Sequence, residues 1–194
     1  MLDKYLSSDI KYSTDGYQLT SDIARYESIM TTDEDELMRE TAAILCSNSG
    51  SVLNVGFGMG IIDSYIRTHN PSEHCIIEAH PQVCKKADDM GFDVYCGKWE
   101  SVVTEFIKDG KKFDSIYFDT FTFDYITHPQ WAPFTKLVPK LLNPNGVYSF
   151  FNEYASKIEK VEEILQTFNW ERHSKTIPFI RMVNGYELVW YINK

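Results

Sequence analysis

The residues with the clearest chemical potential form a glycine-rich run, Asn54-Val55-Gly56-Phe57-Gly58-Met59-Gly60. Glycines let the backbone pass close to a ligand, and a helix that follows them offers free N–H groups and the positive end of its dipole. The same spacing also fits a plain tight turn. Glu78 lies 20 residues after Gly58, where an acid at a strand end can bind the two hydroxyls of a ribose. Alternatively, Glu78 is an ordinary acid at a strand end that is exposed to solvent. Together the loop and Glu78 favour a ribose-containing cofactor, and both NAD and S-adenosylmethionine (SAM) fit.

Two more acidic positions can do chemistry. Asp119, in Tyr117-Phe118-Asp119-Thr120, follows an apolar strand pattern and stands where ligands of open α/β sheets bind. A carboxylate there faces the reacting end of a cofactor, although the spacing fits an ordinary strand-end acid equally well. The run Thr31-Thr32-Asp33-Glu34-Asp35-Glu36 precedes a helix over 34–46. From the residue pattern alone, a helix start is the favoured interpretation, with Thr as N-cap and acids in the first turn.

Regular elements must position these residues, and from residue 50 onward short apolar runs alternate with amphipathic stretches. This alternation indicates βαβ units, right-handed crossovers and a parallel sheet. The expected strands are 52–56, 75–78, 92–96, 114–119 and 146–151. The expected helices are 61–68, 81–90, 102–108 and 131–142, the last ended by the turn signal Asn143-Pro144-Asn145-Gly146.

The C-terminal part has a different pattern. A helix over 158–167 is followed by two β-rich runs, 172–183 and 186–192, and the Asn184-Gly185 between them is a strong hairpin signal. We therefore expect an α/β fold with a seven-stranded, mostly parallel sheet, a C-terminal antiparallel hairpin and helices on both faces. This is the Rossmann-like outline of class I SAM-dependent methyltransferases. It favours SAM over NAD, and an NAD-dependent oxidoreductase is the weaker alternative.

Composition limits the remaining classes. The 194 residues are 43% hydrophobic, enough for one core, and 19 Lys+Arg against 28 Asp+Glu give a formal charge of −9. An acidic surface repels phosphate backbones and attracts cations, so we expect no nucleic-acid partner. No apolar run suits a membrane span or a signal peptide, so we expect a soluble intracellular protein without a membrane partner, cytoplasmic or alternatively nuclear. We expect a single domain over 1–194, with a lid and helical segment at 1–50 and the cofactor-binding core at 51–194.

Cysteines and histidines give no metal signal. The four cysteines have no CxxC spacing, and no histidine pair has ligand spacing, so no metal site is expected. Cys46, Cys75 and Cys96 lie in apolar sequence and are expected in the core.

Several segments together resemble the guanidinoacetate N-methyltransferase family. They resemble still more closely its fungal and plant relatives, the type IV protein arginine methyltransferases, which methylate the internal (δ) nitrogen of arginine. The resemblance covers roughly residues 29–190. It rests on Val52 to Ile62, on Glu78-Ala79-His80-Pro81, on Gly97-Lys98-Trp99-Glu100, on Phe113-Asp114 to Phe118-Asp119-Thr120-Phe121, and on Gly146 to Asn152.

The resemblance implies roles for individual residues. The catalytic pair would be Glu34 and Asp119, which bind the substrate guanidinium in that family, so Glu34 becomes a substrate ligand with helix capping as its second role. Substrate would also meet Met30, Asn152, Glu153 and Tyr154. The cofactor, SAM with S-adenosylhomocysteine as its product, would contact Met30, Met38, Phe57, Gly58, Met59, Gly60, Ile61, Ile62, Glu78, Ala79, His80, Trp99, Glu100 and Asp119.

The chain departs from the family pattern at the lid. The Trp usually found before the lid Glu is Asp33 here, and the usual Thr-Pro after it is Asp35-Glu36. Three functions follow as hypotheses. The first is transfer of a methyl group from SAM to a guanidino nitrogen of arginine in a protein. The second is the same transfer to a small guanidino compound such as guanidinoacetate. The third, suggested by the acidic lid, is a non-catalytic SAM-binding domain.

Overall fold

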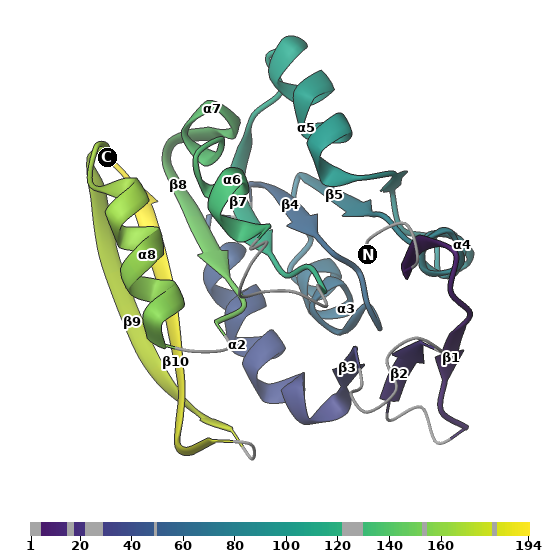
Figure 1. Ribbon diagram of the computed structural model, residues 1–194. Helices are drawn as coiled ribbons and strands as arrows, with labels where there is room; N and C mark the ends of the chain where they lie inside the picture. The colour runs from purple at the N-terminus through teal and green to yellow at the C-terminus, as the bar shows by residue number, and fades with distance from the viewer. Residues whose placement is uncertain are drawn as a thin grey trace.

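A computed structural model describes residues 5–14, 18–21, 29–48, 50–121, 130–152, 155–179 and 182–194, which form two sheets and the helices around them (Figure 1). The strands of the large sheet are β4 (Ser51–Val55), β5 (Glu73–Glu78), β6 (Val94–Cys96), β7 (Phe113–Phe118), β8 (Leu142–Phe150), β9 (Trp170–Phe179) and β10 (Met182–Asn193). The helices are α2 (Asp35–Leu45), α3 (Ile61–Thr68), α4 (Pro81–Asp89), α5 (Trp99–Lys108), α6 (Trp131–Thr135), α7 (Val138–Leu141) and α8 (Ala155–Leu165).

The large sheet has the predicted topology. Its order is β6-β5-β4-β7-β8-β10-β9; the first five strands are parallel, and β10 runs antiparallel to both β8 and β9. Neighbouring strands therefore end together at one edge of the sheet, which brings the residues after β4, β5 and β7 close to one another. The seven-stranded α/β fold with its C-terminal hairpin is confirmed.

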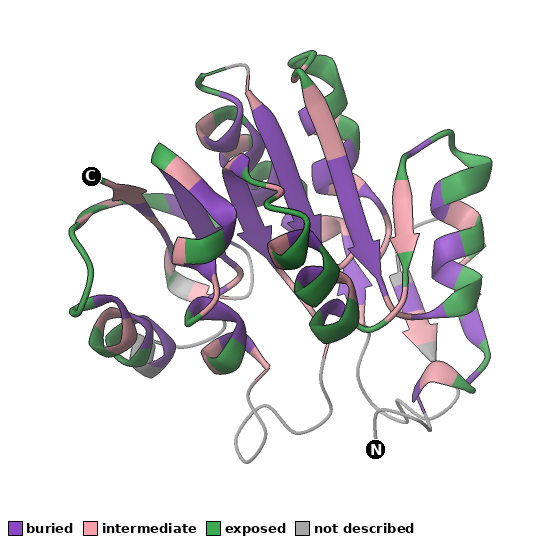
Figure 2. Cartoon of the chain, turned by 90° about the horizontal axis from the view of Figure 1, so that it is seen from above, coloured by how far each residue is buried: buried purple, intermediate pink, exposed green. Residues whose placement is uncertain are grey.

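Helices cover both faces of the sheet, as the strand composition requires. Side chains of a strand point alternately to opposite faces. Ile116 and Phe118 of β7 pack with α5 to α8, whereas Tyr117 between them packs with α2, α3 and α4. β4 is buried at every position, and β5 and β7 are buried over most of their length (Figure 2). Mostly apolar strands of this kind are what a sheet covered on both faces needs.

Two turn predictions are wrong in detail. The helix expected over 131–142 is two short helices, because Pro139 has no N–H to continue the hydrogen-bond ladder of α6. The turn signal at 143–146 lies inside β8 as an irregularity: Phe113 pairs with Leu142 but Ser115 already pairs with Val147. Asn145 takes the left-handed conformation there, with φ of 61°.

The predicted C-terminal hairpin is present, but the Asn184-Gly185 pair that predicted its turn lies at a bulge in β10. Phe179 is paired with Met182, so the two strands already face each other before Asn184-Gly185 is reached. The register then shifts between Met182 and Tyr186, where Gly185 has φ of +77°. A glycine in the left-handed region suits a bulge as well as a turn, which explains the error.

The leading segment, the described residues before α2, forms a second sheet that no sequence pattern indicates. It contains β1 (Ile10–Tyr12), β2 (Gln18–Ser21) and β3 (Met30–Thr31), and it runs from the start of α2 to α4 (Figure 1). Its attachment to α4 is polar: the Ile10 amide donates to Gln82 Oε1 at 2.7 Å, and Lys86 Nζ lies 3.3 Å from the centre of the Tyr12 ring. Strands this short and polar carry no apolar periodicity.

Cys46 and Cys75 are buried as expected, but the expectation for Cys96 is wrong, because it is exposed at the end of the three-residue edge strand β6. Across the described ranges, no helix combines the length and apolar character that a membrane crossing needs.

Candidate active site

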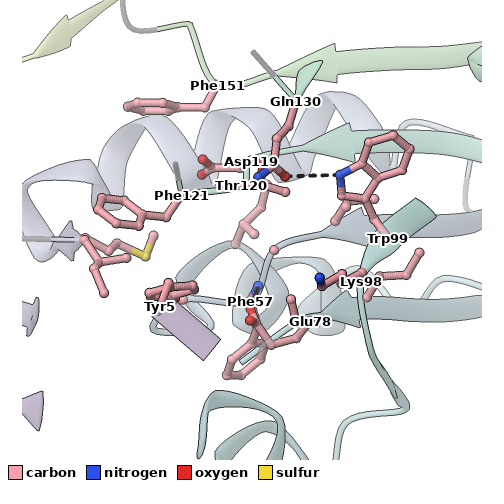
Figure 3. A pocket seen from close by; sticks show the side chains of 18 of the residues that line it. Tyr5, Phe57, Glu78, Lys98, Trp99, Asp119, Thr120, Phe121, Gln130 and Phe151 are labelled. Carbon is pink, nitrogen blue, oxygen red and sulfur yellow. Dashed lines mark hydrogen bonds between the residues drawn. The ribbon is translucent and has the colours of Figure 1, made fainter. Parts of the chain in front are cut away.

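A cleft opens where β4, β5 and β7 end, and most of the sequence-predicted residues meet in it (Figure 3). Asp119 and Phe151 lie on one side of the opening, and Glu78 with Phe57 lies on the other. Further predicted residues that line the cleft are Met30, Glu34, Gly58, Ile62, Ala79, Trp99 and Glu100.

The glycine run passes so close to β7 that side chains are excluded. Gly56 has φ of +102°, and a Cβ placed on it would lie 1.8 Å from the carbonyl oxygen of Asp119. Only glycine allows this conformation and this approach together. The loop that follows β4 is therefore fixed against the residue that carries the Asp119 carboxylate.

Glu78 joins β5 to the same loop. Its Oε2 accepts the Phe57 amide at 2.9 Å, and its Oε1 accepts the His80 amide at 2.7 Å. The interpretation of Glu78 as a solvated strand-end acid is wrong, since its side chain is buried at the cleft wall. Burial raises the pKa of Glu78, and the backbone N–H donors of His80 and Phe57 work against that rise. These bonds engage both carboxylate oxygens and hold the group in place at the cleft wall.

A buried polar network supports the loop from beneath. Asn54 Nδ2 donates to the Gly56 carbonyl and to both oxygens of Asp63, each at 2.9 Å. His74 Nε2 lies 2.9 Å from Asp63 Oδ1 and donates to it. Burial raises the pKa of Asp63, while His74 and Asn54 lower it. No sequence motif indicates this network, because its members come from three separate elements, β4, α3 and β5.

The two candidate catalytic acids reach the cleft from different elements. Glu34 is the residue before α2 and is 5% exposed; Asp119 follows β7 directly. Both carboxylates raise the pKa of the fully buried Tyr117, whose burial raises it most. Both residues line the cleft, and the Tyr117 hydroxyl lies 3.9 Å from Met38 Sδ. The structure thus brings the lid acid and the sheet acid to one cleft, and their roles there stay predictions.

Helix capping, the favoured interpretation of this run from residue pattern alone, has little support. Neither Thr31 at the start of the 3₁₀ turn Thr32–Glu34 nor Glu34 at the start of α2 makes a side-chain capping bond. Of the neighbouring acids, Asp35 accepts the Tyr65 hydroxyl at 2.9 and 2.8 Å. The first turn does carry acids, as the dipole favours.

Trp99 forms another wall and is also a packing anchor. Its Nε1 donates to Gln130 Oε1 at 3.1 Å (Figure 3). Its ring also meets the ring of Phe134 edge-on, with centroids 5.4 Å apart. Contact of the Trp99 ring with a cofactor stays a prediction. Gly97 and Lys98 line the cleft beside it.

Some predicted residues support the cleft from behind. Met59 donates its amide to Met30 Sδ at 3.4 Å, which ties β3 to the glycine loop. His80 caps α4: its Nδ1 accepts the Gln82 amide at 3.2 Å, so Nε2 carries the proton and donates to the Ser8 carbonyl at 3.2 Å. Predicted residues that do not line the cleft are Met38, Met59, Gly60, Ile61, His80 and Asn152; Glu153 and Tyr154 lie outside the described residues.

Several lining residues escaped the sequence analysis. Tyr5 comes from the leading segment, and its ring lies 5.0 Å from His80 and 5.7 Å from Phe121. Gln130 and Phe151 line the cleft from the loops before α6 and after β8. Tyr5 and Gln130 had no motif; Phe121 and Phe151 belong to quoted motifs and could have been found there. In the ranges that the structure covers, no His, Cys, Asp and Glu side chains gather in threes as a metal ion would need.

Comparison with solved structures identifies the fold. An O-methyltransferase from Bacillus cereus, solved with S-adenosylhomocysteine, superposes with a TM-score of 0.60 at 10% identity, over 85% of this chain and 82% of that one. CalS10, an amino pentose methyltransferase from Micromonospora echinaspora, gives 0.59 at 13% identity, over 88% and 93%. The chain thus has the fold of class I SAM-dependent methyltransferases.

Comparison of sequences is more specific. A protein arginine N-methyltransferase 2 from Yarrowia lipolytica is 37% identical over 160 residues, 76% of this chain and 33% of that protein. The namesake from Aspergillus oryzae is 30% identical over 96% of this chain and 44% of its own length. The chain spans well under half of these relatives. Residues 11–171 match the family described as guanidinoacetate N-methyltransferase, and with that match the chain belongs to the guanidinoacetate N-methyltransferase family.

Proposed function

We propose that this chain is a SAM-dependent N-methyltransferase that transfers a methyl group to a guanidino nitrogen, of arginine in a protein. One observation carries the proposal: Glu34 and Asp119 line the same cleft as the glycine loop and Glu78. A carboxylate pair beside a cofactor cleft suits a planar cation. The arginine methyltransferases named above, at 30–37% identity, favour a protein acceptor over a small one.

The residues present fit the cofactor. The Glu78 carboxylate faces the cleft with its remaining lone pairs and suits a ribose diol. Trp99 offers an aromatic wall for an adenine, and the loop at Phe57 and Gly58 leaves room for the methionine part. When bound, SAM supplies an activated methyl group on a sulfonium leaving group.

The chemistry of the methyl acceptor determines what the side chains of the protein must do. A guanidinium is a poor nucleophile, because its lone pairs are delocalised and its pKa is above ~12. Glu34 and Asp119 accept charge-assisted hydrogen bonds from the N–H groups at the edge of the guanidinium plane and so fix one nitrogen in line with the methyl. Such orientation contributes ~7–11 kcal/mol to lowering a barrier. As that nitrogen gains positive charge, both carboxylates stabilise it, and Asp119 accepts the proton.

The test compares charge-neutral variants. Asp119→Asn and Glu34→Gln should still bind SAM by calorimetry, since both replacements keep the size of the side chain and leave Glu78, Trp99 and the glycine loop unchanged. Methyl transfer should fall by about 10²–10⁴-fold for Asp119→Asn, the usual contribution of a positioned base, and by roughly 10–100-fold for Glu34→Gln. Glu36→Gln is the matched control, an exposed acid on the same helix. Undiminished turnover of Asp119→Asn would remove that residue from the mechanism.

Acceptor identity needs a separate experiment. The chain and tritiated SAM are incubated with a ribosomal-protein extract and, in parallel, with free guanidino acids. Label in protein arginine supports the proposal. Label only in a small guanidino acid replaces it with the second hypothesis, and tight SAM binding without any transfer replaces it with the non-catalytic one.

We further propose that residues 1–194 act as one domain in which residues 1–50 close over the cleft, as the contacts of β1 to β3 with α4 and the glycine loop suggest. The acidic chain, at −9, suits a cationic guanidino partner and not a nucleic acid. A cytoplasmic location remains our expectation, with the nucleus as the alternative.

A further inference from the structure

Two thiols lie together behind the cleft wall formed by β5 and β6. Cys84 is buried in α4, and Cys96 is the exposed last residue of β6. Burial and the neighbouring Cys96 thiol both raise the pKa of Cys84. The remaining cysteines, Cys46 and Cys75, are both buried. Cys84 and Cys96 thus form a dithiol pair, close in space, in which the Cys96 thiol is accessible to solvent.

Backbone geometry fixes this pair against the cleft. Cys96 is the register partner of Glu78 on the neighbouring strand. The carbonyl of Glu78 accepts two donors, the Cys84 thiol at 3.2 Å and the Gly97 amide at 2.8 Å. Cys84, through its thiol, and Cys96, through strand pairing and the Gly97 amide next to it, are therefore both held against the Glu78 backbone. Gly97 and the three residues after it line the cleft.

We propose that Cys84 and Cys96 are a modification site, at which a peroxide forms a reversible disulfide that weakens cofactor binding in the adjoining cleft. The coupling to the cofactor rests on the proposed function; formation of the disulfide does not. Neither cysteine belongs to the proposed catalytic or binding residues.

The chemistry balances with one peroxide. Cys96 is the exposed thiol, and its sulfur attacks a peroxide oxygen; the O–O bond breaks, a sulfenic acid forms and one water leaves. The Cys84 sulfur then attacks the Cys96 sulfur; the S–S bond forms, the S–O bond breaks, and hydroxide leaves with the Cys84 proton as a second water. Two thiols are oxidised and one peroxide is reduced to two waters. Burial raises the pKa of Cys84, so Cys96 is the thiol that reacts first.

Closing the bond moves parts of the cleft. A disulfide brings two sulfurs to bonding distance and restricts the Cβ atoms that carry them, so the end of β6 must approach α4. It also removes the Cys84 S–H that donates to Glu78. Residues 97–100 follow Cys96 directly and must shift with it. Coupling of this kind typically changes affinity by about 5–150-fold, and it is reciprocal. Bound S-adenosylhomocysteine should therefore protect the dithiol from oxidation.

The test uses the full chain, reduced and then treated with hydrogen peroxide, alkylated and analysed by mass. We expect a loss of about 2 Da and a linked peptide pair that contains Cys84 and Cys96, reversed by dithiothreitol. Cys96→Ser should not form the link, whereas Cys46→Ser, the matched control, should. Calorimetry with S-adenosylhomocysteine should show about 5–150-fold weaker binding to the linked chain, and no change for peroxide-treated Cys96→Ser.

Three results would overturn the proposal: Cys84 stays alkylatable while Cys96 is oxidised, Cys96 links only between two chains, or the linked chain binds as tightly as the reduced one. If the reduced chain itself fails to bind S-adenosylhomocysteine, the proposed function is refuted, whereas the mass readout still decides whether the disulfide forms.

Discussion

Gly56 is the position at which one methyl group should do the most damage. Its backbone has φ of +102°, and an added Cβ would lie 1.8 Å from the carbonyl oxygen of Asp119, a backbone atom with no side-chain freedom to move. Gly91 is a natural comparison, since its φ is +73° but a Cβ there meets nothing within 4 Å. Gly56→Ala therefore tests backbone strain plus a clash, and Gly91→Ala tests strain alone.

The magnitudes follow from these two geometries. An L residue in the left-handed region costs roughly 1–2 kcal/mol, which both variants share. Forcing an extra carbon into a packed site adds about 1–3 kcal/mol, which falls on Gly56→Ala alone. In a chain of this size each kcal/mol lowers Tm by about 2–4 °C, so Gly56→Ala should melt about 2–12 °C below Gly91→Ala. A displacement of Asp119 by about 1 Å can cost ~100-fold in rate.

The assay is differential scanning calorimetry of both variants together with methyl transfer from tritiated SAM. We expect Gly91→Ala to retain full transfer and Gly56→Ala to lose about 100-fold or more while it still folds at 20 °C. Equal melting temperatures and equal transfer rates for the two variants would refute the claim that the loop and the Asp119 backbone are in required contact.

Three further perturbations follow from the polar groups around the cleft. Glu78→Gln should weaken S-adenosylhomocysteine binding by roughly 10–100-fold in calorimetry, through lost charge-assisted bonds. Burial raises the pKa of Glu78 above its ordinary 4.5. The stabilisation that comes from this raised pKa is therefore fully present below pH 4.5 and is lost as the pH rises through the pKa of the folded state. Urea unfolding at a series of pH values should show this decline in the parent and not in Glu78→Gln. His74→Ala removes one of the two side chains that donate to the buried Asp63 carboxylate, while Asn54 remains, and should lower the free energy of unfolding by about 1–3 kcal/mol; an unchanged Tm would contradict this. Hydrogen bonds from Ser51 hold the pKa of Asp114 below its ordinary 3.8. Asp114→Asn should therefore lower the free energy of unfolding by about 1–2 kcal/mol at pH 7. This difference between parent and variant should vanish as the pH falls through the pKa of the folded state.

The large sheet could be predicted because its strands carry strong local signals. Buried runs such as Ser51–Val55 and Phe113–Phe118 are mostly apolar, and helices separate successive parallel strands at regular spacing. The leading sheet carries no such signal, because β3 has only two residues and β1 includes one buried position of three. Its strands form because the chain there packs against α4 and the glycine loop, which are distant in sequence.

The candidate site divides in the same way. The glycine loop, Glu78 and Asp119 follow strands directly, so their position at one sheet edge follows from topology. Residue pattern alone favoured Glu34 as a helix start, and only the family resemblance pointed to the cleft. Tyr5 and Gln130 have no periodic or motif context, and tertiary packing alone brings them to the cleft wall.

The last strand of the sheet order, β9, has a bearing on how chains behave next to one another. Its outer side is not paired within the described sheet, and such an edge is a template for strand addition and fibre growth. Pro178 has no N–H to offer there. Arg172 is held by Glu162 at 2.6 Å and Lys175 by Glu40 at 2.7 Å, so a neighbouring strand would have to displace ordered charges before it could pair. Concentrated solutions of the chain should therefore resist aggregation through this edge.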